Sequence, residues 1–488
     1  MVAVRPEKRF REQDNVPEAY KRLKLEVGKA SPSTLALPNQ FQKITGPDHA
    51  ICCNRPFETV TIPLVLLHEA FGFFKDRCLQ HPSKAAIECL NELAPSVCMW
   101  HGKETQHRDA VQNVLRKHLR LTFHPEKVPG TEYITDGNLT VVIMPPCIRE
   151  CKNEKGGSLI QATLYYSNFL IHAFNRPENL YNFDTRFPCI LFVDMGMSAS
   201  SSTSHLLMIH SGSYLAFYGA LWDGDRVRVE PLTPGFDLTT HWLETKTRDM
   251  IASSFDALVF AVENIQAHYD KIKAEARVNP APKPYNPQLQ RALNFPFLTS
   301  YIDNAQKTSF RYVKRLDEEK LVFSAFVNDD QRANCIVKFT QRYSEAAHLS
   351  LQSYNSAPTL RHCIRISAEW TAVIMDTSGY TMLFGLRLTK DQQEKIQRKV
   401  VKTLQVLHDA GFVHGDVRST NILIDVESLD SDDVGIHFVD FDWAGHIGEA
   451  RYPSDINGIT VKRPEGAEGG KLITVEHDKT MVSYLFND

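Results

Sequence analysis

Three polar residues near the C-terminal end of the chain, Asp416, Asn421 and Asp440, have the types and spacing that phosphoryl transfer requires. Phosphoryl transfer needs a carboxylate that orients the attacking hydroxyl, and oxygen ligands that hold Mg²⁺ on the phosphates. Asp416 and Asn421 lie five residues apart, so one loop can supply the base and one metal ligand. Asp440 follows an apolar run, and we expect it to supply the second metal ligand.

A second polar set lies in the N-terminal half of the chain. Asp136 is followed by Glu150 and Lys152, and the period-two alternation of a strand places Glu150 and Lys152 on one face. Two carboxylates and a lysine are the minimum for metal-dependent hydrolysis of a phosphodiester. Asp136 and Glu150 would hold a divalent cation, and Lys152 would orient or polarise the attacking water.

The elements that must position the C-terminal set can be predicted from the local pattern. A helix is predicted over Gln392 to Ala410, and it ends at Gly411, as expected of a glycine that closes a helix. The β-like pair 412–413 then leads into the loop, and the run 436–439 predicts the strand before Asp440.

The C-terminal motifs resemble those of the protein-kinase superfamily. The similar segments are Val337-Lys-Phe, Ala357-Pro-Thr-Leu, His414-Gly-Asp, Asp440-Phe-Asp-Trp-Ala-Gly and Arg451-Tyr-Pro-Ser-Asp-Ile-Asn. As a set they resemble the kinase-like domains common in fungal, especially mushroom-type, proteomes, some of which belong to Crinkler-like or related toxin-type proteins. The resemblance covers roughly residues 295–488.

This resemblance implies ATP and Mg²⁺ as cofactors and gives several residues expected roles. Asp416 is the catalytic base, and Arg418 stands where protein kinases usually carry a lysine that contacts phosphate. Lys338 ends an apolar strand and would grip the α and β phosphates, with Glu345 on the next helix as its partner. Met375 ends the strand that enters the connection between the two lobes.

The chain departs from typical protein kinases in four features. The hairpin 310–327 contains no glycine, so the usual phosphate-covering loop is not recognisable. Gly415 and Asp442 replace an arginine and a glycine, and both changes are similar to aminoglycoside and choline kinases. Arg418 replaces a lysine. The chain also ends soon after Asp442, which predicts a shortened C-terminal lobe in which Asp478 anchors the catalytic loop.

The N-terminal set resembles the PD-(D/E)xK superfamily of restriction-endonuclease-like proteins. Gln161 and Tyr165 follow on a predicted helix at i and i+4, so they share a face. They are similar to the Gln-x-x-x-Tyr variant of some recombination nucleases. Glu104, on an earlier predicted helix, is a candidate further acidic ligand. This resemblance implies a second divalent metal and a nucleic-acid substrate, and the pairing with a kinase-like domain is itself a pattern of the fungal toxin-like proteins.

The predicted fold class is α+β with two domains: an N-terminal α/β restriction-endonuclease-like core and a C-terminal bilobal protein-kinase-like fold. Four prolines between Asn279 and Pro287 favour an extended connector between them. The hairpin expected across Asp223-Gly224 belongs to the first domain. The predicted segments are a polar extension at 1–46, the nuclease-like domain at 47–276, the linker at 277–294 and the kinase-like domain at 295–488.

Bulk composition narrows the functional classes. The 488 residues carry a formal net charge of −3, so no global basic field indicates nucleic-acid binding, although a local groove would be compatible with this value. No apolar run approaches the roughly 20 residues that span a bilayer, and no signal peptide is recognisable. The scattered cysteines indicate a reducing compartment. We therefore expect an intracellular protein that does not contact membranes; its oligomeric state is open.

Four functional interpretations remain at this stage. The first is an ATP-dependent protein Ser/Thr kinase fused to a nuclease-like domain. The second keeps the chemistry but has a small-molecule acceptor. In the third, the C-terminal domain is a pseudokinase or a nucleotide-binding regulator. In the fourth, the nuclease-like domain carries the main activity on DNA, and the kinase-like part controls it.

Overall fold

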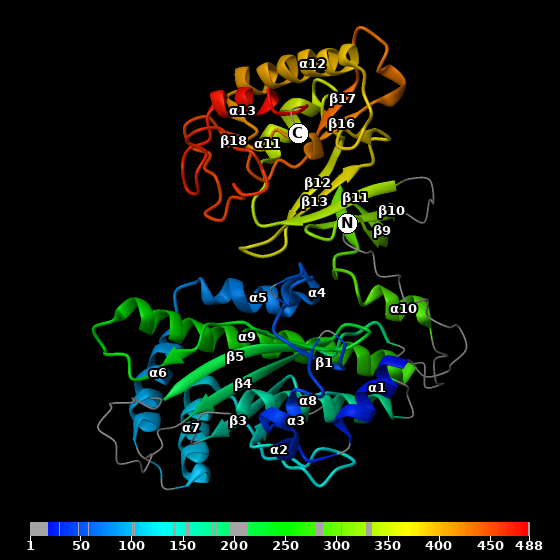
Figure 1. Cartoon of the computed structure of the whole chain (residues 1–488). Helices are drawn as coiled ribbons and strands as arrows, with labels where there is room; N and C mark the ends of the chain where they lie inside the picture. Colours follow the sequence, from blue (N-terminus) through cyan, green and yellow to red (C-terminus); the bar gives the residue numbers. More distant parts are fainter. Residues whose placement is uncertain are drawn as a thin grey trace. The chain divides into compact units, whose positions relative to one another are not determined.

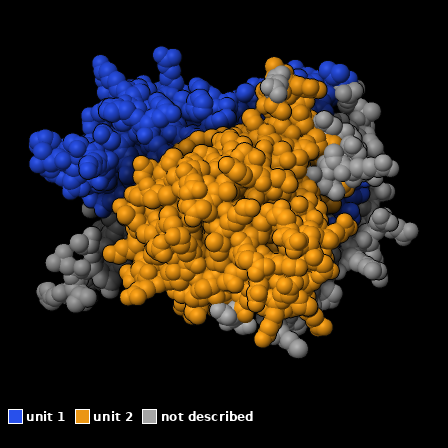
Figure 2. Space-filling model, turned by 90° about the horizontal axis from the view of Figure 1, so that it is seen from above, with its two compact units in different colours: residues 1–298 blue, residues 299–488 orange. Residues whose placement is uncertain are grey.

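The chain forms two compact units, residues 1–298 and 299–488, which Figure 2 colours separately. The structure is a computed structural model and describes residues 18–28, 30–46, 48–56, 58–99, 101, 103–139, 143–152, 157–176, 180, 183–195, 213–278, 286–303, 305–327 and 334–486. Residues 1–17 of the expected N-terminal extension and residues 279–285 of the expected linker lie outside the described residues.

Unit 1 is built on a mixed seven-stranded sheet with the strand order β1-β6-β5-β4-β3-β2 and with β7 paired to β5. Its strands are β1 Ile51–Cys53, β2 Gly137–Asn138, β3 Cys147–Lys152, β4 Cys189–Met195, β5 Tyr214–Trp222, β6 Val227–Pro231 and β7 Phe236–Asp237. The β2–β3 pair is antiparallel, whereas β3 and β4 are parallel. Parallel neighbours need a crossover connection, and α8 lies between them in the chain.

Helices cover both faces of this sheet (Figure 1). They are α1 Glu18–Val27, α2 Pro32–Leu35, α3 Pro38–Phe41, α4 Leu64–Leu67, α5 Glu69–Cys78, α6 Lys84–Cys98, α7 Glu104–Leu119, α8 Ser158–Phe174, α9 Thr245–Val278 and α10 Pro287–Ala292. Figure 1 shows α5 and α9 on one side of the strands and α8 with α1 on the other. The parallel strands are therefore buried on both faces, which explains why β4 has almost no polar residue.

The local sequence pattern predicted several elements of unit 1 well. The predicted hairpin is confirmed, because β5 and β6 pair antiparallel and Gly224 adopts a positive φ of 95° in the turn. Strand β3 begins at Cys147, directly after Pro145 and Pro146, because proline has no N–H to donate to a ladder.

The N-terminal residues of the described chain belong to unit 1 and are not a separate extension. Leu23 and Val27 of α1 are fully buried. Arg22 forms an ion pair of 2.8 Å with Asp225 in the β5–β6 turn. The polar extension predicted at 1–46 therefore contains a helix, α1, whose apolar side packs on the domain.

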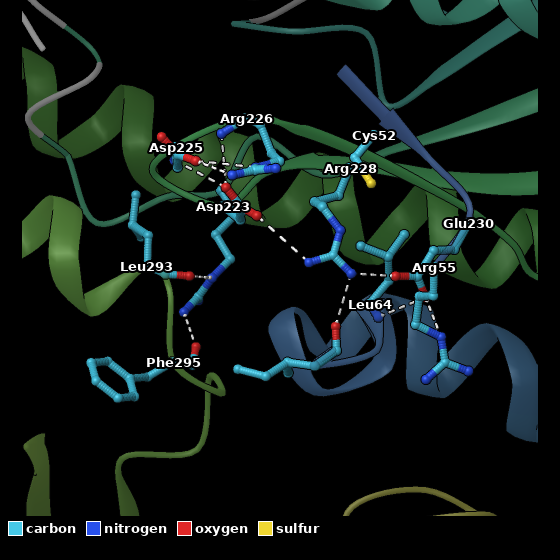
Figure 3. Close-up of polar contacts among 12 residues, drawn as sticks. Cys52, Arg55, Leu64, Asp223, Asp225, Arg226, Arg228, Glu230, Leu293 and Phe295 are labelled. Atoms are coloured by element: carbon cyan, nitrogen blue, oxygen red, sulfur yellow. Dashed lines mark hydrogen bonds and ion pairs between the residues drawn. The ribbon is translucent and has the colours of Figure 1, made fainter. Parts of the chain in front are cut away.

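Part of the predicted linker is also held by unit 1. The guanidinium of Arg186 donates hydrogen bonds to the carbonyls of Leu293 (3.2 Å) and Phe295 (2.8 Å), both labelled in Figure 3. Helix α10 packs against the hairpin turn, because a Cβ on Gly224 would lie 2.4 Å from the carbonyl oxygen of Gln290. The division therefore falls after Leu298 and not within the proline-rich segment.

A network of ion pairs holds the N-terminal end of α4 in place (Figure 3). Arg228 on β6 pairs with Glu230 at 2.7 Å and with Asp223 at 3.6 Å. A carboxylate oxygen of Glu230 also accepts a hydrogen bond from the backbone N–H of Leu64, the first residue of α4. These charges are buried but mutually paired, so they serve to hold the chain between β1 and α4 in place.

Unit 2 begins with a six-stranded antiparallel sheet of order β12-β13-β11-β10-β9-β8. Its strands are β8 Ser300–Asp303, β9 Gln306–Arg315, β10 Leu321–Val327, β11 Asn334–Thr340, β12 Leu360–Arg365 and β13 Thr371–Asp376. Helix α11, Glu345–Gln352, connects β11 to β12. The predicted hairpin over 310–327 is confirmed as β9 and β10.

The rest of unit 2 is a helix with short strands around the predicted catalytic loop. The elements are β14 Thr381–Met382, α12 Lys390–Asp409, β15 Phe412–Val413, β16 Ile422–Ile424, β17 Ile436–Phe438, β18 Gly445–His446 and α13 Val475–Val482. Helix α12 starts with a capping box between Thr389 and Gln392 and is followed by Gly411 with a φ of 85°. The predicted helix and its glycine terminator are therefore confirmed.

The apolar face of α12 organises the core of this lobe. Ile396, Val400 and Leu404 are buried in one cluster with Ile422 of β16, the strand that follows the loop, and with Phe438 of β17. The loop that carries Asp416 is thus supported by packed elements on both sides. Among the described residues, we find no helix with the length and apolar character needed to cross a bilayer.

Candidate functional sites

The loop from His414 to Asn421 in unit 2 is held in place by one buried carboxylate. Asp478 on α13 accepts hydrogen bonds from the backbone N–H groups of His414 and Gly415, both at 2.8 Å. Its other contact is with Nε2 of His408 on α12 at 3.0 Å. The predicted anchoring of the loop by Asp478 is confirmed, and the carboxylate joins α12, α13 and the loop.

Replacing Asp478 with Ala is expected to lower the free energy of unfolding of unit 2 by about 2–5 kcal/mol, because it leaves buried N–H groups without an acceptor. Urea unfolding of the full chain, followed with a spectroscopic probe that reports on unit 2, measures this loss. Asp432→Ala is the matched control, because Asp432 is exposed. Equal unfolding curves for the two variants would contradict an anchoring role.

Asp416 is surrounded by three hydrogen-bond donors. Its Oδ2 accepts from Nε of Arg418 at 3.0 Å and from Nδ2 of Asn421 at 2.7 Å. Its Oδ1 accepts from Nη1 of Arg463 at 2.7 Å. Asn421 uses its amide nitrogen for Asp416, so its side-chain oxygen is left to serve as a ligand. The predicted pair of Asp416 and Asn421 is therefore brought together in one loop.

Arg463 was not identified from the sequence. It is only 6% exposed, and its guanidinium carbon lies 4.8 Å from the ring centre of Trp443. It comes from the irregular segment between β18 and α13, 47 residues after Asp416. No local spacing connects two residues so far apart; the adjacent basic pair Lys462-Arg463 in an otherwise polar segment was the only signal.

Asp440 is brought to Lys338, as the predicted phosphate and metal sites require. Lys338 on β11 forms ion pairs with Asp440 and with Asp442, the latter at 2.6 Å. Asp440 has a positive φ of 70°, which is uncommon for a residue other than glycine and is associated with functional positions. A second lysine, Lys320 from the turn between β9 and β10, also pairs with Asp440.

The two carboxylates at this position have opposite pKa shifts. Burial disfavours the charged form of Asp440, but Lys338 and Lys320 outweigh it and hold its pKa below the ordinary value. Burial, together with Asp440 and against Lys338, raises the pKa of Asp442 to about 6. Asp440 is thus ionised, and its two oxygens are neutralised by the ammonium groups of Lys320 and Lys338.

The expected partnership of Lys338 with Glu345 does not occur. Glu345 is exposed in the first turn of α11, where a negative charge is stabilised by the helix dipole. Lys338 is instead satisfied by Asp440 and by Asp442, the residue that stands in place of the usual glycine. Met375 is buried near the end of β13, paired in register with Ile336 on β11, so it lies on the strand next to that of Lys338.

The described polar residues of unit 1 also converge as predicted. Nζ of Lys152 lies 3.1 Å from Glu150, 3.1 Å from Glu104 and 3.7 Å from Asp136. Asp136 is fixed by accepting a hydrogen bond from the backbone N–H of Cys151 at 3.0 Å. Glu104 comes from the start of α7, Asp136 precedes β2, and the other two lie on β3. Three carboxylates around one lysine form a site with the donor set of a divalent cation.

Glu150 is the most perturbed member of this cluster. Its side chain is 1% exposed, and its Oε2 is buried with no hydrogen-bond partner among the described residues. Burial, reinforced by Asp136 and opposed by Lys152, raises the pKa of Glu150 to about 8. A buried carboxylate oxygen without a donor is what a cation ligand requires, so the residues fit a divalent metal.

This shift predicts a pH dependence of stability. An unfolded glutamate releases its proton near pH 4.3, whereas folded Glu150 keeps it up to about pH 8. Between these values the folded state binds the extra proton, so the free energy of unfolding of the metal-free chain should fall by a few kcal/mol at most as the pH rises. Calorimetry in a chelator should show this decline for the wild type and a weaker one for Glu150→Gln. Identical pH profiles would contradict the assignment.

The helix after β3 contributes the predicted aromatic residue. Tyr165 on α8 is half-buried, and its pKa is raised, first by burial and then by the charges of Glu150 and Asp136. Gln161 lies one turn earlier on the same face and is also half-buried. Residues 153–156, which include most of the glycine-rich exit of the strand, lie outside the described residues.

The opposite face of β3 carries a second polar cluster that sequence reasoning missed. Arg149 forms a two-pronged ion pair with Asp194 on β4, at 2.6 and 3.0 Å, and His107 on α7 lies 2.9 Å from the same carboxylate. With Cys151, His107 and Asp194 have the residue types of a metal site. Arg149 already neutralises Asp194, however, and also donates to the carbonyl of Arg108, so the cluster ties α7 to the sheet.

Unit 2 has a kinase-like fold. Three consecutive antiparallel strands, β9, β10 and β11, carry the lysine on the third strand. A helix and a hairpin follow, and the loop with Asp416 and Asn421 comes before β17, which ends two residues before Asp440. This is the order in which protein kinases present the same groups. In the described chain after Asp440, the secondary structure is limited to β18 and α13.

No family model and no curated protein matches the chain. Among solved structures, it is similar to the kinase PK-1 of Cydia pomonella granulovirus, with 20% sequence identity and a TM-score of 0.30, over 36% of this chain and 65% of the viral one. It is also similar to vaccinia related kinase 3, with 14% identity and a TM-score of 0.29, over 39% of this chain and 68% of that one. The chain thus spans about two thirds of each structure.

Proposed function

We propose that unit 2 is an ATP- and Mg²⁺-dependent phosphotransferase. The observation that carries this proposal is a combination of two contacts. Asp416 and Asn421 are hydrogen-bonded on one loop, and Lys338 on β11 forms an ion pair with Asp440, which follows β17. The separation of roles matches what phosphoryl transfer needs, since catalysis consists mainly of positioning and electrostatic stabilisation.

Each residue has one task in this proposal. Asp416 accepts the hydrogen bond of the acceptor hydroxyl and orients it toward the γ-phosphate. Asn421 and Asp440 hold the magnesium ion, which neutralises charge on the phosphates when it is bound. Lys338, which now pairs with Asp440 and Asp442, would bind phosphate oxygens of ATP.

We infer that the acceptor is a protein Ser or Thr hydroxyl. The alternative, a small cationic acceptor such as an aminoglycoside or choline, was suggested by Gly415 and Asp442. The guanidinium groups of Arg418 and Arg463 both form ion pairs with Asp416, at 3.0 and 2.7 Å. They disfavour a cationic acceptor and favour a hydroxyl flanked by acidic residues.

The test is to incubate the full chain with γ-labelled ATP, Mg²⁺ and matched acidic and basic peptides that contain Ser and Thr. Transfer that favours the acidic peptides supports the proposal, and a chelator should abolish it. A folded chain that binds MgATP without any transfer would favour the pseudokinase interpretation. Transfer only to small cationic alcohols would overturn the protein acceptor.

A second activity is proposed for unit 1, a metal-dependent nuclease. The observation that favours it is the buried, unpartnered oxygen of Glu150 in a cluster with Asp136, Glu104 and Lys152. Asp136 and Glu150 would hold the cation, and Lys152 would position the attacking water. Incubation with duplex DNA, single-stranded DNA and RNA in Mg²⁺ or Mn²⁺ tests this activity and its preference. The absence of cleavage of all three substrates would overturn it.

A further inference from the structure

The turn between β9 and β10 of unit 2 is closed by its own side chains. Oδ1 of Asp317 accepts from the backbone N–H groups of Glu319 (2.8 Å) and Lys320 (3.1 Å). The guanidinium of Arg315 donates to the carbonyls of Asp317, Glu318 and Lys320. In a glycine-rich turn the backbone N–H groups are free to contact phosphates. Here two of those N–H groups are already occupied.

The same turn sends one side chain to the metal-binding residue. Lys320 is the last residue before β10, and its Nζ pairs with Oδ2 of Asp440. Lys338 pairs with the other oxygen, Oδ1. The two lysines come from neighbouring segments of the sheet and place two ammonium groups on one carboxylate.

We propose that Lys320 is a second phosphate-binding residue of unit 2, and that its ammonium group replaces the backbone N–H groups of a glycine-rich turn. This inference rests on the proposed phosphotransferase function. A cation held by Asp440 would compensate the charge of that carboxylate and would leave both ammonium groups for anionic oxygens. Asp440 is the proposed ligand of the magnesium ion that accompanies the phosphates, and the contact of Lys320 with Asp440 places its ammonium group beside that position.

The physical chemistry of the two donors accounts for the exchange. Backbone N–H groups and ammonium groups can both donate to an anionic phosphate oxygen, but an ammonium group also carries a full positive charge and three donors. A lysine can therefore take the place of backbone amides, and the turn needs no glycine because no phosphate approaches its backbone. The absence of glycine from 310–327, which weakened the kinase interpretation at the sequence level, then follows from a different way of binding phosphate.

The experiment is isothermal titration of the full chain with MgATP and with adenosine. The variants are Lys320→Met, Lys320→Arg and Lys338→Met, and Lys307→Met is the control because Lys307 is exposed at the far end of β9. Lys320 is 34% exposed, so its replacement leaves the core intact. We expect Lys320→Met to weaken MgATP binding about tenfold or more and to leave adenosine binding unchanged. Lys320→Arg should retain most of the affinity, since the charge is kept.

The outcomes separate this inference from the function on which it rests. If Lys338→Met weakens MgATP binding and Lys320→Met does not, the phosphotransferase proposal stands and the role of Lys320 is overturned. Equal losses of MgATP and adenosine binding in Lys320→Met would mean a structural role and also overturn it. A wild-type chain that binds neither MgATP nor adenosine would overturn both proposals.

Discussion

Replacing Asp416 with Asn should lower phosphate transfer by about 10²–10⁴-fold and leave MgATP binding nearly unchanged. The amide keeps the size of the carboxylate, but it can no longer take the proton of the acceptor hydroxyl, and this is the range that general-base catalysis contributes. Asp416 is the proposed base and is not among the proposed metal ligands. Single-turnover transfer of labelled phosphate, together with MgATP titration, measures the two effects separately.

Asp440→Asn provides the comparison for this prediction. Asp440 is the proposed metal ligand, so its replacement should weaken MgATP binding as well as transfer. The exposed Asp432→Asn is the matched control and should behave as the wild type. If Asp416→Asn retains full transfer, the catalytic assignment of the loop is wrong. If it loses nucleotide binding in parallel with Asp440→Asn, Asp416 belongs to the nucleotide site.

Replacing Asp136 with Asn, or Lys152 with Met, should lower the rate of metal-dependent cleavage by unit 1 to about a hundredth of the wild-type rate or less. Asp136→Asn removes a charged ligand and should also weaken Mn²⁺ binding. Lys152→Met removes the group proposed to position water and leaves three carboxylates, Glu104, Asp136 and Glu150, without their shared cation. Metal binding by Lys152→Met should therefore persist while cleavage is lost.

Cleavage of labelled DNA and Mn²⁺ titration measure this difference. Glu263→Gln on α9 is the control, because Glu263 is exposed on a helix of the same unit. Cleavage that survives in both Asp136→Asn and Lys152→Met would show that the nuclease activity, if present, does not use this cluster. A change of cleavage in Asp416→Asn would support the interpretation in which the kinase-like unit controls the nuclease-like one.

Several features of both sites were predictable because they depend on residues close together in the chain. Asp416 and Asn421 meet because one loop carries both. Glu150 and Lys152 meet because alternate residues of a strand share a face. The end of α12 at Gly411 follows from the left-handed conformation that glycine adopts readily. In each case, the backbone geometry over a few residues decides the result.

The tertiary structure decided which distant charges become partners. Lys338 was expected to pair with Glu345, seven residues away. In the structure it pairs instead with Asp440 and Asp442, which follow β17. Arg463 reaches Asp416 from a segment without regular structure, and no periodicity indicates where such a segment will pack. The same holds for the boundary after Leu298, since the side chain of Arg186 and the packing of α10 hold the residues before it to unit 1.

The sequence by itself therefore identified the groups on which both proposals rest: a candidate base and two candidate oxygen ligands for phosphoryl transfer, and two acids and a lysine for hydrolysis. Only the tertiary structure decided which opposite charges pair with those groups. Lys320 could not be identified from the sequence, because a lysine in a polar turn is ordinarily solvated. Only the fold brings the β9–β10 turn close enough for Lys320 to pair with Asp440. Local spacing fixes which groups are near in the chain, whereas the packing of strands and helices fixes which charges share a site.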